Sequence, residues 1–560
     1  MSRIFEEIVE KRGLTEEFLN PKYLSDEKIH EKMPDIKKAV SRIVSAISKG
    51  EKIMVYGDYD VDGVTATTVM VDALRLAGAS EVITMLPDRF IDGYGMSKRC
   101  VERAASEGVS LVITVDCGSN NSAVISELKK AGIDTIATDH HEVMAEVPED
   151  AVAVVNPKRT DVSKKAQKAI SDAGLNELAG VGVAFMVARA LVSEGKIPEG
   201  QEKWMLDLVL IGTLCDSMKI TGVNRELTFF GKKVLEKTRR LGLVELMRVA
   251  KMTKITSEAI GFQIGPRLNA GGRMESAEIS LKLLMTDSKT EAVRLAEELN
   301  NLNTERRNEQ MAAMDEISKR CEKELSRPVI VVSGEWHEGV LGIIAGRLVE
   351  KYHKPAFVLS KVSVSDVDGD GFLDVYKGSG RSFGEFNLAD AIRNCSGSVF
   401  AGGGHAAACG LSVLPEKIED FANDVNGYYV SLKLKNQERF LEVSAEISES
   451  DLSEFSEELL DELSLLEPFG EGNKEPIFEL ENVEVFEARE VGKDGKHLRM
   501  VVLDKNHQRM TLVSFFAPEK WMEISEGEKL NVKVQLMRNE WNGRVFVEGR
   551  ILGLEKITDI

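Results

Sequence analysis

The chain lacks any apolar stretch long enough to cross a membrane, since no run approaches the roughly 20 residues that a membrane helix needs. The opening stretch, MSRIFEEIVEKRGL, is charged and has no apolar centre of the kind found in secretory signals. Charged residues make up 29% of the 560 residues and hydrophobic residues 43%, which is typical of a globular protein in water. We therefore expect a soluble, cytoplasmic protein.

Cysteine is scarce and scattered. No two of the six cysteines form a C-x-x-C pair; they lie at positions 100, 117, 215, 321, 395 and 409. This spacing argues against a zinc site and against a disulfide framework. Most of these side chains are expected to be small buried hydrophobic groups.

Positive charge is also in short supply. The chain has 72 basic and 92 acidic residues, a net charge of −20, which taken alone argues against a polyanionic partner. The acid is concentrated in patches, and the run Glu446–Glu467 holds acidic residues and no basic one. Any nucleic-acid groove must therefore be built locally, from a few arginines.

Apolar runs in the first part of the chain alternate with helical patterns. The runs KIMVYGD, EVITMLP, LVITVDCG, IDTIATDHH and AVAVVNP are typical of buried strands, and VTATTVMVDALRLAG has the character of the helix between two of them. Such alternation predicts a parallel, doubly wound α/β sheet. Ligands of such sheets bind beyond the carboxyl ends of the strands.

The chain is too long for one ordinary core, so we expect several domains. Residues 289–325 are charged and nearly free of glycine and proline, which predicts a long helix connecting two domains. A second strand, turn, helix, strand pattern begins at RPVIVVSG. We predict an N-terminal helical segment (1–40), an α/β domain (41–285), a connecting helix (286–326), a second α/β domain (327–430) and a C-terminal β-domain (431–560).

The C-terminal domain is expected to begin with an acidic helix at 451–465, followed by short strands. Five short strands with turn signals suggest a small OB-like barrel, and a small sandwich is the alternative that the sequence leaves open. The strand-like runs are 477–485, 496–503, 509–516, 529–537 and 544–551.

Three aspartates crowd the turn after the first predicted strand. Asp58, Asp60 and Asp62 lie two apart in GDYDVDG. Like charges this close repel, so a positive partner is expected among them. D-x-D-x-D-G also opens a calcium-binding EF-hand loop, but position 12 would be Val69 instead of glutamate, and this loop follows a strand rather than a helix. The EF-hand interpretation therefore fails.

The remaining interpretation is a catalytic metal centre with ligands from neighbouring strand ends. Asp116 follows LVITV, and TDHHE supplies Asp139, His140 and His141. Asp216 ends an apolar segment, where a lone carboxylate would be costly to bury. Mixed carboxylate and imidazole ligands suit Mn²⁺ better than Ca²⁺. A lone strand-end aspartate is usually a turn or helix cap, but tandem histidines beside three acidic strand ends favour two divalent ions that hydrolyse a phosphoester.

A second D-x-D-x-D-G run occurs at Asp366–Asp374. Its position 12 is Lys377, so it fails as an EF-hand too. We interpret it as the acidic, solvated tip of a hairpin.

Several short motifs, taken in their order along the chain, resemble those of a known family. GDYDVDG, VDCG, TDHHE and LIGTLCDS are similar to the four ordered motifs of the DHH phosphoesterase superfamily, which is named for residues matching Asp139, His140 and His141. GFQIGPRLNAGGRM, GSGRS, GGGHAAACG and LEPFGEGN resemble the RecJ branch, bacterial single-strand DNA exonucleases. The resemblance runs from about residue 50 to 480 and implies a DHH domain, a DHH-associated substrate-binding domain and an OB-like tail.

The resemblance implies two Mn²⁺ or Mg²⁺ ions. Asp60 and Asp116 would hold one of them, with support from Asp58. Asp116 would also bind the second ion, and His141 would act beside it in catalysis by facing the scissile phosphate. The implied ligands of the second ion are Asp62, Asp116, His140 and Asp216.

Substrate contacts are expected on both sides of the cleft. GGGHAAACG offers backbone amides and His405 as a phosphate cradle. KGSGRS offers Ser379 and Arg381, whose guanidinium can grip phosphate. By resemblance, this second domain closes over the cleft, while Arg89 reaches a terminal 5′-phosphate and Tyr94 stacks on a base.

Further basic residues have two interpretations each. Arg267 and Arg273 would line the path of the strand, as would Arg306 and Arg307 on the connecting helix. Arg267 could instead form a structural ion pair, and the two helix arginines could simply be solvated. In the same way His337 either caps a helix or contacts a nucleotide. Arg381 and His405 are the substrate contacts that we favour most.

The C-terminal domain is expected to bind DNA away from the cut site. Its candidate stacking residues are equally well explained as core; they are Phe515, Phe516, Trp521 and Trp541. The resemblance further implies single-strand-binding protein and a helicase as partners, and we expect a monomer.

Three functions are compatible with some or all of these sequence features. The first is a metal-dependent 5′-to-3′ exonuclease that releases 5′-mononucleotides from single-stranded DNA in repair and recombination. The second, a phosphoesterase for small substrates or very short oligonucleotides, has no need of the OB-like tail. The third, a DNA-binding scaffold without catalysis, is disfavoured because every ligand position is filled.

Overall fold

Five short, mainly apolar strands form the first sheet of the computed structural model, which describes residues 1–93, 95–144, 146–365, 372–434, 443–492, 496–515, 517–541 and 543–557. All pairings in this sheet are parallel, in the order β2-β1-β3-β4-β5, as the strand and helix alternation predicts. The strands are β1 (Ile53–Tyr56), β2 (Val82–Met85), β3 (Leu111–Val115), β4 (Asp134–Thr138) and β5 (Ala153–Val155).

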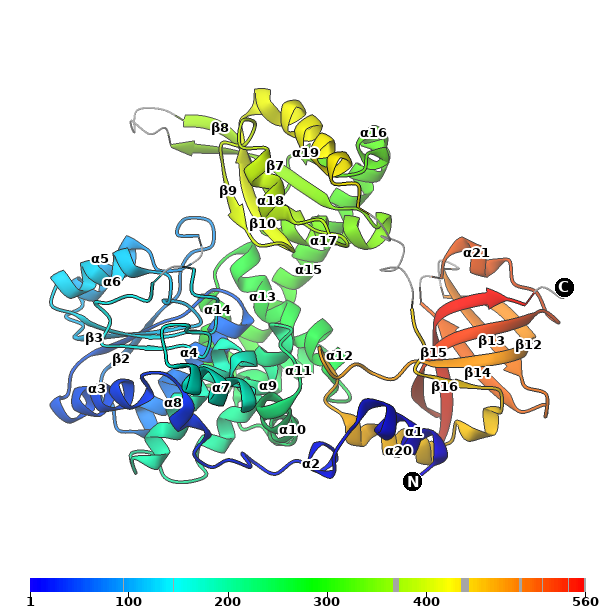
Figure 1. Ribbon diagram of the computed structural model, residues 1–560, viewed down its shortest axis with the longest axis horizontal. Helices are drawn as coiled ribbons and strands as arrows, with labels where there is room; N and C mark the ends of the chain where they lie inside the picture. The colour runs from blue at the N-terminus through cyan, green and yellow to red at the C-terminus, as the bar shows by residue number, and fades with distance from the viewer. Residues whose placement is uncertain are drawn as a thin grey trace.

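Helices cover both faces of this sheet. Successive strand residues point to opposite faces, so Ile53 and Val55 enter one core while Met54 and Tyr56 enter another. In Figure 1, α5 and α6 lie on one side of the sheet and α3 and α8 on the other. The helices of this domain are α3 (Ile36–Lys49), α4 (Val61–Leu76), α5 (Lys98–Ser106), α6 (Ser122–Lys130), α7 (Lys164–Asp172), α8 (Gly180–Ser193), α9 (Leu206–Cys215), α10 (Gly222–Leu235), α11 (Leu241–Val249), α12 (Ser257–Ala259), α13 (Gly265–Met274) and α14 (Glu278–Met285).

A 32-residue helix, α15 (Lys289–Arg320), joins the two α/β domains. The sequence predicts a helix through residue 325, but the backbone leaves the helical region at Cys321 and a short α16 (Glu322–Ser326) follows. Ala292 and Leu295 pack in the first domain, whereas Ala313 and Ile317 pack in the second, so α15 belongs to both cores. Among the described residues, no helix combines the length and apolar character needed to span a bilayer.

The second domain is a mixed sheet in the order β6-β7-β8-β10-β9, with β6 and β7 parallel and the remaining pairs antiparallel. The acidic run Asp366–Asp374 follows β7, and its last residues, 372–374, belong to β8. Its residues 366–371 lie outside the described part of the chain. The elements are β6 (Ile330–Gly334), α17 (Leu341–Tyr352), β7 (Ala356–Ser365), β8 (Phe372–Arg381), α18 (Leu388–Asn394), β9 (Ala401–Gly404), β10 (Ala408–Val413) and α19 (Ile418–Leu432).

The C-terminal sheet closes on itself, because β12 pairs with both β13 and β15 while β14, β16 and β15 follow one another. This closure establishes the barrel and excludes the sandwich. The acidic stretch predicted as a helix over 451–465 is α-helical only in α20 (Glu457–Leu463), where the Ser456 side chain caps the helix start. The strands are β11 (Ile447–Glu449), β12 (Phe478–Val491), β13 (His497–Leu503), β14 (Arg509–Ser514), β15 (Lys529–Trp541) and β16 (Arg544–Lys556), with a short α21 (Glu519–Met522).

The first helix belongs to this C-terminal domain. α1 (Arg3–Arg12) buries Ile4, Phe5 and Ile8 among barrel and α20 side chains, and Figure 1 shows it beside α20 under the barrel. Arg12 forms a two-pronged pair with Glu446, at 2.6 and 2.7 Å. The chain then runs through α2 (Glu16–Leu19) to the first domain. The segment predicted as one N-terminal unit, 1–40, is therefore divided between two cores, and α3 continues across its predicted end.

Shortening the apolar face of α1 should loosen the barrel and leave the first domain intact. Phe5→Ala removes a fully buried ring, a change that costs about 3–5 kcal/mol in well-packed cores. Hydrogen exchange followed by mass spectrometry should show faster exchange in β12 and β15 and unchanged protection in β1 and β3. Glu6→Ala, at an exposed position of the same helix, is the control, and faster exchange in β1 and β3 would contradict this assignment of α1.

Candidate metal centre and phosphate cleft

The turn between β1 and α4 places the first three acidic residues. Asp60 caps α4 by accepting a hydrogen bond from the Gly63 amide at 3.0 Å. Asp62 lies in the first turn, where its carboxylate accepts from the backbone N–H groups of Gly180 and Val181, at 2.6 and 2.9 Å. A Cβ at Gly63 would lie 2.5 Å from the Asp58 carbonyl oxygen, so the tight turn requires glycine. The D-x-D-x-D-G pattern is thus a strand-to-helix turn that keeps three carboxylates together.

Two further aspartates complete the carboxylate cluster. Asp116 follows β3 with φ of 61°, a left-handed conformation that non-glycine residues rarely adopt. A Cβ at Gly180 would lie 2.5 Å from the Asp116 Oδ1 atom, so the start of α8 must be a glycine for that carboxylate to fit. Asp216 is the C-cap residue of α9. The cluster is therefore assembled from strand ends on one side and from helices α8 and α9 on the other.

His140 sits at the centre of this cluster. Its Nε2 atom lies 3.1 Å from Asp116 Oδ1, 3.6 Å from Asp216 Oδ2 and 3.8 Å from Asp62 Oδ2. Burial lowers the pKa of His140 to about 3, with a further contribution from His141. The imidazole is thus neutral at physiological pH, which is the form that binds a metal ion.

The surrounding carboxyl groups have raised pKa values. Burial is the largest cause, and the charge of Asp60 the second largest, that raises the pKa of Asp58 to about 8 and that of Asp62 to about 7. Burial, followed by the charges of Asp62 and Asp60, raises the pKa of Asp216 to about 8. Burial and all four neighbouring aspartates raise the pKa of Asp116 well above its ordinary value. The protein's own cations do not neutralise these groups.

This donor set fits divalent metal ions. Asp58 Oδ1 is buried and has no hydrogen-bond donor within the described residues. Ligand atoms within 4.8 Å of one another occur in three groups, and Asp116 belongs to two of them. The mixture of carboxylate oxygen and imidazole nitrogen matches Mn²⁺ or Mg²⁺. The groups are Asp58, Asp60 and Asp116; Asp62, His140 and Asp216; and Asp116, His140 and His141.

Asp139 orients His141 instead of joining the carboxylate cluster. Its Oδ1 atom lies 2.9 Å from His141 Nδ1 and accepts backbone hydrogen bonds from His140 and His141, while Oδ2 accepts from the Ser119 amide. Burial alone would lower the pKa of His141, but the hydrogen bond and charge of Asp139 raise it above its ordinary value. The His141 side chain is 37% exposed, so its ring is open to the cleft on one side.

Sequence reasoning missed the residues that support these side chains. The pairing of Asp139 with His141 has no local signal beyond their adjacency. Asn156 at the end of β5 donates to Ser119 Oγ and to the His141 carbonyl, and so holds the histidine loop. The AGVGVA stretch that begins α8 was a signal that could have been used, since small residues at a helix start permit close approach of a carboxylate.

Four predicted phosphate or DNA contacts, three of them arginines, lie near one another beside the metal centre. Arg89 lies with its guanidinium 4.6 Å from the Tyr59 ring centre, in a cavity of about 320 Å³ that Ser379 also lines. Burial, followed by the charges of Arg89, Arg306 and Arg381, lowers the pKa of Arg273 to about 9. Burial and Arg89 also lower the pKa of Arg381. Cations that repel one another in this way form a site for an anion.

Other predicted contacts lie elsewhere. Arg267 is bound to the Gln263 carbonyl and to Asn300 and lies near Arg307, so it joins α13 to α15. His405 is exposed at the end of β9. His337 caps a short 3₁₀ helix by accepting from the Gly339 amide at 3.1 Å. Tyr94 lies outside the described residues.

The predicted stacking residues of the barrel differ in exposure. Phe515 is 60% exposed and contacts His497 edge to face, whereas Trp521 packs against the barrel core. Phe516 and the side chain of Trp541 lie outside the described part of the structure.

The raised pKa values predict how metal binding depends on pH. In the unfolded chain these aspartates lose their protons near pH 3.8, whereas in the folded, metal-free chain Asp58, Asp62 and Asp216 keep them to about pH 7–8. The metal-free protein should therefore lose stability as pH rises through this window, and metal binding should release protons. We expect Mn²⁺ to raise the melting temperature more at pH 8 than at pH 6 in scanning calorimetry. An equal increase at both pH values would contradict the assignment.

Three family models match the chain in order. They are the DHH family N-terminal domain over residues 52–213, the DHHA1 domain over 326–431 and the RecJ OB domain over 448–552. These matches fall on the first α/β domain, the second α/β domain and the barrel.

Named relatives agree with these models. The chain is 35% identical over 516 residues to the single-stranded-DNA-specific exonuclease RecJ of Bacillus subtilis. The aligned region covers 91% of this chain and 62% of that protein. It is 33% identical to the RecJ of Haemophilus influenzae, with 84% of this chain and 81% of that protein covered. The crystal structure of Thermus thermophilus RecJ with Mn²⁺ superimposes with a TM-score of 0.80 at 27% identity, covering all of this chain and 77% of the other. The chain therefore belongs to the RecJ family of single-stranded-DNA-specific exonucleases.

Proposed function

We propose that this chain is a metal-dependent exonuclease that degrades single-stranded DNA from its 5′ end and releases 5′-mononucleotides. The observation that carries the proposal is the buried cluster in which Asp116 is shared by two potential ligand groups. Asp58 and Asp60 would complete one site with Asp116, and Asp62, His140 and Asp216 the other. When bound, two such ions supply an activated water and stabilise the leaving oxygen of a phosphoester.

The chain's own residues hold the substrate and move protons. Arg89, Arg273 and Arg381 offer an uncompensated positive site for the backbone phosphates. Ser379 lines the same cavity as Arg89, which supports a role for both in binding a terminal 5′-phosphate. His141, kept protonated to higher pH by Asp139, would donate a proton or hydrogen bond to the reacting phosphate. His405 and Tyr94 keep their proposed substrate contacts as part of this hypothesis.

The barrel favours long strands over the alternative small substrates. An OB-like domain of more than a hundred residues has no use in hydrolysing a dinucleotide, and Phe515 offers an exposed ring for an unpaired base. We extend the proposal to a monomer that works in cytoplasmic DNA repair and recombination with single-strand-binding protein and a helicase. The resemblance to the exonuclease family supports this extension.

A degradation assay tests the activity directly. Single-stranded DNA labelled separately at its 5′ and 3′ ends is incubated with Mn²⁺ and wild type, Asp116→Asn or the exposed control Asp172→Asn. We expect mononucleotides at once from the 5′ label only. Asp116→Asn should lose at least about 10³-fold in rate, because both potential ligand groups lose a charge, and the control should match wild type. Intact long strands with hydrolysed dinucleotides would favour the small-substrate alternative.

Asp139→Asn tests the role of His141. Removing the negative charge should lower the pKa of His141, since an adjacent opposite charge contributes about 1–3 pH units. If protonated His141 is required, kcat/KM falls above that pKa, and in Asp139→Asn the fall should begin at lower pH. Measuring kcat/KM from pH 6 to 9 gives the comparison, with Asp172→Asn again as control. A reduced rate with an unchanged profile would assign Asp139 a purely structural role.

A further inference from the structure

A groove of about 610 Å³ leads from the metal centre toward the barrel. Cys215 and Ser217, which flank the ligand Asp216, line one wall, and Gln535 and Arg550 of the barrel line the far end. The groove therefore runs beside the predicted metal ligand Asp216. If the 5′ end of a strand lies at the metals, as proposed above, the rest of the strand must leave along such a path.

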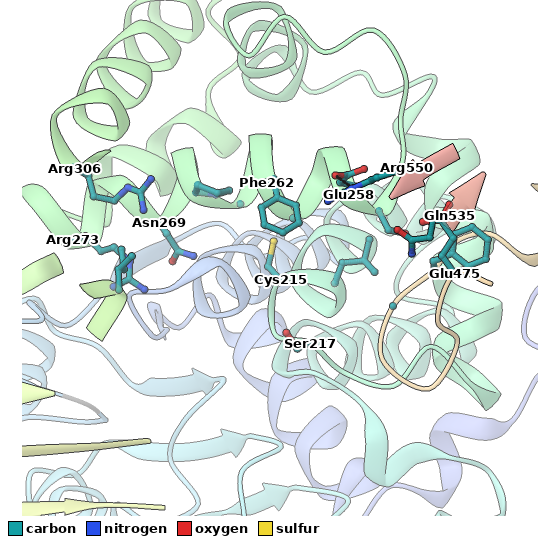
Figure 2. A pocket seen from close by; sticks show the side chains of 18 residues that line it. Cys215, Ser217, Glu258, Phe262, Asn269, Arg273, Arg306, Glu475, Gln535 and Arg550 are labelled. Carbon is teal, nitrogen blue, oxygen red and sulfur yellow. Dashed lines mark hydrogen bonds and ion pairs between the residues drawn. The ribbon is translucent and has the colours of Figure 1, made fainter. Parts of the chain in front are cut away.

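Phe262 projects into the middle of this groove (Figure 2). Its side chain is 73% exposed, while its neighbours Ile260 and Ile264 are buried. These residues form a π-helical turn (Ile260–Ile264) between α12 and α13, and such turns are rare and frequently occur at functional sites. The start of α13 packs closely on Cys215, the residue before Asp216, because a Cβ at Gly265 would lie 2.6 Å from Cys215 Sγ. A large apolar ring is thus presented at a fixed place near the reacting end of the strand.

The two ends of the groove differ in charge. Arg273 and Arg306 line the end near the cleft, and Arg306 Nε is buried without a hydrogen-bond partner among the described residues. The barrel end has Glu258, paired with Arg550 at 3.0 Å, and Glu475. Burial, followed by Glu258 and Glu467, raises the pKa of Glu475 to about 7. Phosphates suit the arginine end, whereas the acidic end suits the uncharged bases.

The polar lining of the groove can accept any base. Asn269, between Phe262 and the arginine end, and Gln535, at the barrel end, carry amide groups that both donate and accept hydrogen bonds. Stacking on an aromatic ring is likewise tolerant of sequence, because every base has a π-face. This combination matches an enzyme that must move along a strand of any sequence.

We propose that Phe262 stacks on a nucleobase of the single strand, on the 3′ side of the scissile phosphate, and so positions the strand between the metal centre and the barrel. The proposal rests on the exonuclease function proposed above. It makes Phe262 a substrate-positioning residue and the groove a base-binding site.

An abasic scan tests this pairing. Oligonucleotides of about 20 nucleotides carry one abasic residue at successive positions from the 5′ end, and the first-turnover rate constant at subsaturating enzyme is measured for each. Wild type should slow roughly 5- to 100-fold at one position, where a stacked base is lost. Phe262→Ala should slow by a similar factor on the intact strand and show no further loss at that position. Phe262→Trp should restore the wild-type pattern.

The remaining variants separate the possible outcomes. Phe262→Leu keeps apolar bulk without a π-face, so it should behave like Phe262→Ala and answers the question if the alanine variant is unstable. Phe486→Ala, which removes an exposed ring with no proposed role in binding, should keep the sensitivity of wild type at that position. The same abasic sensitivity in wild type and Phe262→Leu would overturn the stacking proposal. A wild-type enzyme that degrades no single-stranded DNA would instead overturn the proposed function itself.

Discussion

Mutual repulsion between buried carboxylates is the constraint on which the first domain depends. Asp58, Asp62 and Asp116 are nearly inaccessible to solvent, and each raises the cost of ionising another. The fold holds them in place with backbone groups: the first amides of α8 bind Asp62, and the Asp60 carboxylate caps α4. Gly63 lies where a side chain would meet the Asp58 backbone, and Gly180 lies where one would displace the Asp116 carboxylate. The architecture therefore keeps the cluster in place without neutralising it.

The cleft beside the carboxylate cluster has a similar arrangement, but with positively charged side chains that repel one another. Burial, together with the charge of Arg89, lowers the pKa values of Arg273 and Arg381. Among the described residues, no ion pair joins these three arginines to the aspartates of the cluster. Most other arginines of the first domain are paired, such as Arg240 with Asp72 and Asp207. A protein with a net charge of −20 thus keeps, within the described residues, a small group of arginines without carboxylate partners beside its acidic cluster. Local charge, and not the total, determines what can bind.

Local patterns in the sequence were enough to predict the parallel sheet and to select the acidic residues that meet in space. Strand ends of a parallel sheet share one edge, so Asp58, Asp116 and His140 had to be neighbours. Features that depend on distant partners were not predictable. The exposure of Phe262 depends on one π-helical turn, and the orienting role of Asp139 depends on a side-chain rotation. The closure of the barrel depends on the pairing of β12 with β15. The alternation of apolar and polar residues within each strand does not predict which strand it pairs with.

The position of α1 has a consequence for synthesis of the chain. The Ser2 amide binds the Glu462 carboxylate, 460 positions later, and the core that receives Ile4, Phe5 and Ile8 is made from the last quarter of the chain. At ribosomal rates of about 5–20 residues per second, this helix waits roughly 30 to 110 seconds for its complete binding surface. During that time its apolar face is open to water and to other nascent chains. This helix thus leaves the ribosome long before its native contacts can form, and the growing chain needs protection there until the barrel emerges.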